Sequence, residues 1–171
     1  MINTLHNLIS NGVISELLNS PEKWDSLIIN RRKPYTYRVF TMYNDLRICL
    51  HEFDECSKEE SFIHPHPWPA AFMILCGEYN LKIGRSNNIL DKPEKWHTLS
   101  IAGESSYEMV DPLEWHAITP LRKTYTIMIN GPNYNNPHTL CRTTKGKDLD
   151  KLNEEEKNKS LLLFKDLLNF K

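Results

Sequence analysis

The spacing of apolar residues along the chain changes near residue 35. Between residues 3 and 19 they recur at helical intervals, with an interruption at Gly12 and a stop at Pro21, which predicts one kinked helix or two short helices. From Tyr35 onward, short segments rich in β-branched and aromatic residues alternate with Gly, Pro, Asn and Asp, the pattern of an all-β sandwich or barrel. Residues 22–33 fit neither pattern. Strands are expected at about 35–42, 46–53, 62–66, 71–76, 79–83, 96–100, 107–110, 114–118 and 124–130.

The connections and the C-terminal segment carry their own signals. Cys76-Gly77-Glu78 separates two strand segments, and we expect a hairpin there. Residues 131–147 are expected to form a surface loop, and the segment after them an amphipathic helix whose charged first turns are solvated. Its apolar stripe is expected to pack on the barrel or on a second subunit, so a homodimer is one possible arrangement. The stripe consists of Leu161, Leu162, Phe164, Leu167, Leu168 and Phe170.

Length and charge narrow the class of protein. A chain of 171 residues predicts one domain with a full core, and a net charge of -1 argues against nucleic acid or an anionic membrane as partner. No apolar run reaches the ~20 residues of a membrane span, and the N-terminus lacks the features of a signal peptide, so we expect a cytoplasmic protein. The cysteines show no metal-binding spacing and are expected to be thiols, mostly buried; they are Cys49, Cys56, Cys76 and Cys141.

The strongest chemical signal is His64-Pro65-His66-Pro67-Trp68-Pro69. In a strand, residues i and i+2 point to one face with Cα atoms ~6.6–7 Å apart, so both imidazoles can reach one metal ion. Each histidine precedes a proline, which favours extended backbone and reinforces this geometry. Seven histidines placed at random would give such a pair in about one sequence in four, so the spacing alone is a weak motif. Its context has to support it.

That context is an apolar strand, a turn at Gly77, further strands, and then His116 in Glu114-Trp115-His116. This order resembles the cupin superfamily, and His64-Pro65-His66-Pro67-Trp68 resembles a group of small bacterial and phage cupins. The resemblance implies a double-stranded β-helix, or jelly roll, with His64, His66 and His116 as metal ligands. The organisation expected is a single domain with an N-terminal helical segment (1–34), a cupin barrel (35–132), and a loop with the C-terminal helix (133–171).

One departure from the cupin pattern concerns the fourth ligand. Many cupins have a Glu a few residues after the second His, where this chain has Ala70, Ala71 and Phe72. The site is then three histidines with open positions, or it takes a carboxylate from elsewhere. Glu114 is the candidate because it is two residues from His116, and His51 is a further ligand or supporting residue. Imidazoles suit several divalent metals, so Fe(II) is expected by analogy only, with Zn or Ni as alternatives.

Thiol dioxygenases are cupins that also use three histidines, and Tyr35-Thr36-Tyr37-Arg38 resembles their substrate-binding strand. The resemblance implies that Arg38 binds an anionic group of a small molecule, and Trp68 is positioned to form a pocket wall. The other residues of that family's site do not match, so cysteine oxidation is not expected. The predicted function is a non-haem metal-dependent oxygenase acting on a small polar or anionic molecule.

Other functions, and purely structural roles for the candidate residues, are alternatives to these predictions. The alternatives to an oxygenase are a non-catalytic metal- or sugar-binding cupin and a cupin-type isomerase or epimerase with a histidine as general base. The three histidines can be hydrogen-bonded barrel residues without metal, and Arg38 can form an ion pair at a strand edge. His6 and His138 are expected at the surface, and His97 either lines the barrel or is exposed.

Overall fold

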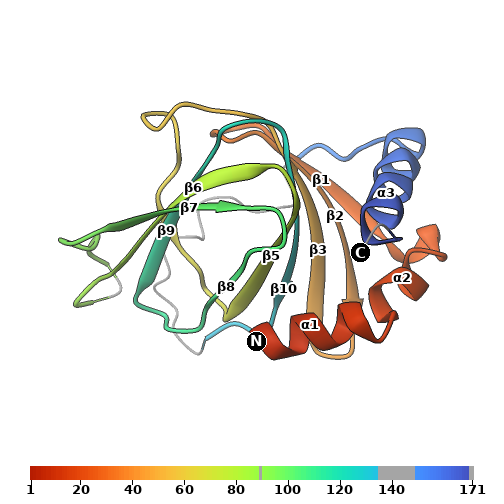
Figure 1. Ribbon diagram of the computed structural model, residues 1–171, viewed down its shortest axis with the longest axis horizontal. Helices are drawn as coiled ribbons and strands as arrows, with labels where there is room; N and C mark the ends of the chain where they lie inside the picture. The colour runs from red at the N-terminus through yellow and green to blue at the C-terminus, as the bar shows by residue number, and fades with distance from the viewer. Residues whose placement is uncertain (89, 135–148, 170–171) are drawn as a thin grey trace.

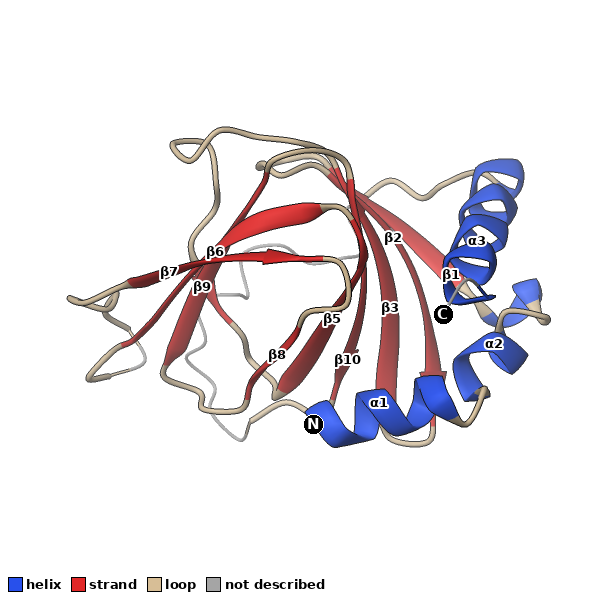
Figure 2. Ribbon diagram, viewed as in Figure 1, coloured by secondary structure: helices blue, strands red, loops and turns tan. Residues whose placement is uncertain are grey.

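The computed structural model describes residues 1–88, 90–134 and 149–169. Two antiparallel sheets close into a jelly-roll barrel, and the helices lie on one side of it (Figures 1 and 2). The larger sheet has the strand order β1-β2-β3-β10-β5-β8, and the smaller has the order β4-β9-β6-β7. This architecture confirms the predicted all-β jelly roll with helices at both ends.

The strand boundaries agree with the sequence pattern at nine of the ten strands. The larger sheet contains β1 (Asp25–Ile29), β2 (Thr36–Tyr43), β3 (Leu46–Phe53), β10 (Thr124–Asn130), β5 (Ala70–Cys76) and β8 (Ser106–Met109). The smaller sheet contains β4 (His64–Pro65), β9 (Glu114–Pro120), β6 (Glu78–Arg85) and β7 (His97–Ala102).

Strand β1 is the exception, because it lies inside the segment 1–34 that was expected to be helical. It pairs with β2 from Asp25 opposite Phe40 to Ile29 opposite Thr36. Five residues at a sheet edge are too few to display a periodic pattern, so pairing with β2 defines the strand. The six-stranded sheet therefore begins ten residues earlier than the expected barrel boundary at residue 35.

The N-terminal segment forms two short helices, α1 (Ile2–Ser10) and α2 (Val13–Leu17). Gly12 separates them with a φ of 73°, a left-handed conformation that glycine adopts without steric cost. This separation confirms the predicted break at Gly12. Both helices pack on the outer face of the larger sheet. The core of this layer includes Leu5, Leu8, Ile14, Leu18, Ile48, Leu50, Ile127 and Ile129.

The C-terminal helix α3 (Glu154–Asn169) completes the same outer layer (Figure 1). Leu161, Phe164 and Leu168 are buried against the sheet, whereas Leu162 is 61% exposed. The predicted stripe was too wide at this point, because Leu162 is about 100° around the helix from Leu161. Phe170 and most of the predicted loop lie outside the described residues.

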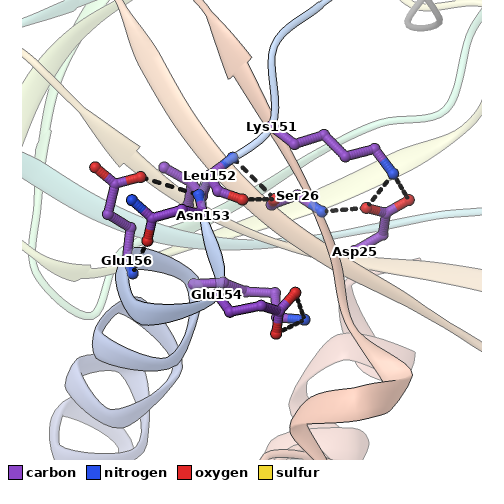
Figure 3. A network of polar contacts seen from close by, with 8 residues as sticks. Asp25, Ser26, Lys151, Leu152, Asn153, Glu154 and Glu156 are labelled. Carbon is purple, nitrogen blue, oxygen red and sulfur yellow. Dashed lines mark hydrogen bonds and ion pairs between the residues drawn. The ribbon is translucent and has the colours of Figure 1, made fainter.

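The approach to α3 is tied to strand β1 by polar contacts (Figure 3). The amide of Leu152 donates to Ser26 Oγ at 3.1 Å, and Lys151 Nζ lies 2.8 Å from an oxygen of Asp25. These contacts hold the start of the helix against the edge of the larger sheet.

The first turn of α3 is capped by its own side chains (Figure 3). The Glu156 amide donates to Asn153 Oδ1 at 2.9 Å, and the Asn153 amide donates to Glu156 Oε2 at 3.0 Å, a reciprocal capping box. The run of charged residues was expected to be solvated throughout, but Lys157 is buried and its Nζ lies 2.9 Å from Glu154 Oε2. Its long alkyl chain can pack against the sheet while the ammonium reaches a carboxylate.

The predicted hairpin at Gly77 is wrong. Strand β5 pairs with β10 and β8, while β6 pairs with β9 and β7, so the chain passes from one sheet to the other at this residue. Gly77 has a φ of 92°, and a Cβ there would lie 2.5 Å from Thr124 Oγ1 and 2.8 Å from the Lys123 carbonyl oxygen. The glycine allows the chain to turn a tight corner from one sheet to the other. In the sequence, such a corner has the same glycine-containing turn motif as a hairpin.

Three cysteines are described, and all are free thiols. Cys49 is buried and Cys56 half-buried, but Cys76 at the end of β5 is exposed, contrary to the expectation of burial. Among the described helices, none has both the length and the apolar character needed to span a membrane.

Phe164 should contribute most to the docking of α3, because its ring is fully buried and meets Tyr125 edge-on with centroids 5.9 Å apart. We expect Phe164→Ala to lower the free energy of unfolding by about 3–5 kcal/mol, the usual loss for a large buried aromatic. Leu162→Ala, on the same helix but exposed, should change it by less than about 0.5 kcal/mol. Urea denaturation measures both; equal effects of the two substitutions would contradict the described docking.

Candidate metal centre

The three predicted ligands meet where strand β4 pairs with β9. Strand β4 places His64 opposite His116 and Pro65 opposite Trp115. His66 follows directly, and the proline after each of these two histidines favours extended backbone. Residues 50 positions apart in the chain thus contribute to one cluster.

The imidazoles approach each other through their Nε2 atoms. His116 Nε2 lies 2.9 Å from His66 Nε2 and 3.3 Å from His64 Nε2. One ligand atom from each of the three rings lies within 4.8 Å of the others. The convergence predicted for His64, His66 and His116 is therefore present in the structure. Within the described residues, this cluster contains no carboxylate or thiol.

Burial keeps these imidazoles neutral. His66 and His116 are only 8% and 3% exposed, and desolvation lowers the pKa of each well below 6.5, with the neighbouring histidines adding to the effect. The pKa of His64 is lowered to about 4, chiefly by desolvation. A neutral imidazole has a nitrogen lone pair available, which is the form that binds a metal.

One hydrogen bond defines the tautomer of His64. Its Nδ1 lies 3.3 Å from the Phe62 carbonyl oxygen, which can only accept, so Nδ1 carries the hydrogen and Nε2 presents its lone pair to the cluster. The Phe62 ring also stacks on His64, with centroids 5.1 Å apart and planes 6° from parallel. His66 Nδ1 is buried without a partner among the described residues.

An aromatic layer that the sequence analysis did not single out surrounds His116. Phe72 lies 5.7 Å from His116 between ring centroids, and Tyr107 stacks on Phe72 at 4.6 Å. Tyr107 Oη is 3.5 Å from His116 Nδ1 and accepts a hydrogen bond from Tyr79 Oη at 3.2 Å. Burial raises the pKa of both phenols, which keeps them protonated. Alternation along β8 alone does not distinguish Tyr107 from an ordinary core tyrosine.

Arg38 and His51 form a second polar pair inside the barrel. They are opposite each other on β2 and β3, and Arg38 Nε donates to His51 Nε2 at 2.8 Å. His51 Nδ1 is 3.4 Å from Thr126 Oγ1. Desolvation, followed by the charge of Arg38, lowers the pKa of His51 well below its usual range. His51 is thus a partner of Arg38 and lies outside the histidine cluster.

The charge of Arg38 also acts on the cluster itself. It contributes to the lowered pKa of both His64 and His66, so the guanidinium lies within electrostatic reach of the proposed ligands. The predicted orientation of Arg38 toward the barrel interior agrees with these effects and with its bond to His51.

The remaining candidates have separate positions. Glu114 Oε2 accepts hydrogen bonds from the amides of Val110 and Asp111, at 2.9 and 3.1 Å, so its carboxylate closes a turn and is not in the cluster. Trp68 meets His66 edge-on with centroids 6.1 Å apart. His6 and His97 are exposed, and His138 lies outside the described residues.

Comparison with known proteins defines the fold. No family model and no curated protein matches the chain. Among solved structures, Fe(II)-HppE with the alternative substrate (S)-1-HPP has a TM-score of 0.52 at 16% identity, covering 64% of this chain and 57% of that one. Hydroxypropylphosphonic acid epoxidase from S. wedmorenis has a TM-score of 0.51 at 17% identity, covering 64% and 56%. The chain thus spans less than two thirds of these proteins, and the likeness establishes a shared cupin fold.

The buried histidines predict a pH dependence of stability in metal-free protein. Unfolded imidazoles bind protons near pH 6.5, whereas in the folded protein the pKa of His64 is about 4 and desolvation also lowers the pKa values of His66 and His116 well below 6.5. Between these values the unfolded state binds more protons, so the free energy of unfolding should fall as the pH is lowered from about 6.5 toward about 4. Urea midpoints of chelator-treated protein at about pH 7.5 and about pH 5 measure this loss. His64→Asn should make the loss smaller, and a midpoint that is constant with pH would contradict the prediction.

Proposed function

We propose that the three histidines hold one divalent transition metal and that the protein is a non-haem metal-dependent oxygenase acting on a small polar or anionic molecule. The observation that carries the proposal is the cluster of three neutral imidazoles, two buried and the third, His64, half-buried, with converging Nε2 atoms. A metal at this point would take the Nε2 lone pairs, which desolvation keeps free of protons at neutral pH.

The nitrogen separations fit a metal. Two nitrogens bound to one metal at about 2.1 Å lie about 3.0 Å apart when the bonds are at 90° and about 3.4 Å apart at the tetrahedral angle. The separations of 2.9 and 3.3 Å between His116 Nε2 and the other two Nε2 atoms match this range. Three protein ligands leave coordination positions for substrate, which is characteristic of catalytic rather than structural sites.

Iron is our first choice of metal, with zinc or nickel as alternatives, because the fold neighbour was solved as Fe(II)-HppE. Imidazole ligands alone do not select among these metals. When bound, Fe(II) would supply the redox and O2 chemistry that protein side chains lack. The Phe72 and Tyr107 rings line the His116 side of the site.

Arg38 and Trp68 are the proposed substrate-binding residues. His51 orients Arg38 by accepting from its Nε, and a guanidinium is the side-chain group suited to a bidentate contact with a carboxylate or similar anion. The buried environment would strengthen that contact relative to one at the surface. Trp68, beside His66, supplies an apolar wall.

Metal content tests the first part of the proposal. Protein purified without chelator and without a His tag should contain about one metal ion per chain, and His64→Ala, His66→Ala or His116→Ala should each lower metal affinity by at least about 10–100-fold. His97→Ala, on the exposed strand β7, is the matched control and should retain the metal. Full metal content in a His64→Ala/His66→Ala double variant, by mass spectrometry of the metal, would refute the site.

Oxygen uptake tests the second part. Iron-loaded protein should consume O2 with at least one member of a panel of small thiols and amino, keto and hydroxy acids, and free cysteine should give no sulfinic acid. Arg38→Ala should raise KM for an anionic substrate by about 10-fold or more, since it removes a charge-assisted contact. Turnover that is unaffected by Arg38→Ala would retain the oxygenase and refute this role of Arg38. Metal binding with no turnover on the panel would favour a binding protein.

A further inference from the structure

A cavity of about 560 Å³ lies outside the histidine cluster, where the loop after β1 meets the segment before β4. We call it the basic pocket. The amide of Phe62 donates to the Lys33 carbonyl oxygen at 3.2 Å, which joins the two segments, and Lys92 reaches the pocket from the connection between β6 and β7. Its charged lining residues are Arg31, Arg32, Lys33, Lys92, Glu59 and Glu60.

Positive charge exceeds negative charge in this pocket. Glu60 is already engaged, because its carboxylate lies 2.7 Å from Lys33 Nζ and accepts from the Ser57 amide at 3.0 Å. The lining residues carry four formal positive charges (Arg31, Arg32, Lys33 and Lys92) against two negative ones (Glu59 and Glu60). The whole chain has a net charge of -1, so this concentration of cations is a local feature.

Arg32 is held in a geometry suited to anion binding. Its guanidinium carbon lies over the Phe62 ring, 4.3 Å from the ring centroid, in a cation–π contact. A guanidinium has five N–H donors, so a cation–π contact with a ring is compatible with hydrogen bonds from these groups to an anion. The same Phe62 ring stacks on His64, so the pocket shares a wall residue with the proposed metal centre.

We propose that the basic pocket binds a doubly charged anionic group, of the phosphate ester class, carried by a small molecule. Several cations around one cavity suit a dianion better than a single carboxylate. A volume of about 560 Å³ is larger than a bare ion needs and lies in the range of small-molecule sites, and Phe62 and Tyr35 offer aromatic surface for an organic part. This site does not require the metal and extends beyond the proposed oxygenase function.

Calorimetric titration with phenyl phosphate tests the proposal, with phenol as the neutral analogue. Wild-type protein should bind phenyl phosphate with a dissociation constant of about 1 mM or tighter, weakening as salt is raised, and should not bind phenol measurably. Arg32→Ala/Lys92→Ala should weaken binding at least about 10-fold. Both side chains are exposed, so folding is retained, and Lys92→Glu alone should give a loss in the same direction.

Two controls separate this proposal from others. Arg122→Ala/Lys159→Ala removes the same two charge types elsewhere on the exposed surface and should leave the affinity within about 2-fold. His66→Ala, without bound metal, should also retain phenyl phosphate binding. No saturable binding to wild-type protein, or an equal loss in the control pair, would overturn the pocket. Binding that disappears only in His66→Ala would assign the anion to the metal centre, which overturns the pocket and leaves the proposed function intact.

Discussion

The larger sheet is buried on both faces, and the rest of the structure depends on this constraint. Side chains alternate along each strand, so Ile48 and Leu50 of β3 pack under the helices while Cys49 and His51 lie in the barrel. The helices at both ends of the chain are therefore needed to cover the outer face of the sheet. A slip of one residue would exchange these two sets and place His51 in the helical layer.

The inner face supports polar groups that are costly to bury. Four imidazoles lie inside the barrel, and desolvation lowers the pKa of each. Neutral imidazoles need fewer compensating contacts than charged ones, and the same neutrality leaves their nitrogens able to bind a cation. Arg38 donates a hydrogen bond to one of them, His51, and this bond gives its side chain a defined direction. The chemistry proposed for the site thus follows from what burial does to histidine.

The basic pocket and the histidine cluster present contrasting environments on either side of Phe62. The cluster is largely buried and its imidazoles are neutral, while the pocket is open and positively charged. One aromatic ring stacked on His64 and under Arg32 belongs to both environments.

The local pattern of residues in the sequence determined many of the secondary-structure elements and part of the candidate metal site. Strand positions, the break at Gly12 and the pairing of two same-face histidines follow from propensities and spacing within short segments, so the sequence alone predicted them. Long-range pairing decided the rest. The corner at Gly77, the edge strand β1 and the outward position of Leu162 depend on which segments meet. The hydrogen bond of the Glu114 carboxylate to a turn and the contact of Tyr107 with His116 also depend on the tertiary structure. The linear pattern does not specify which residues become neighbours in space.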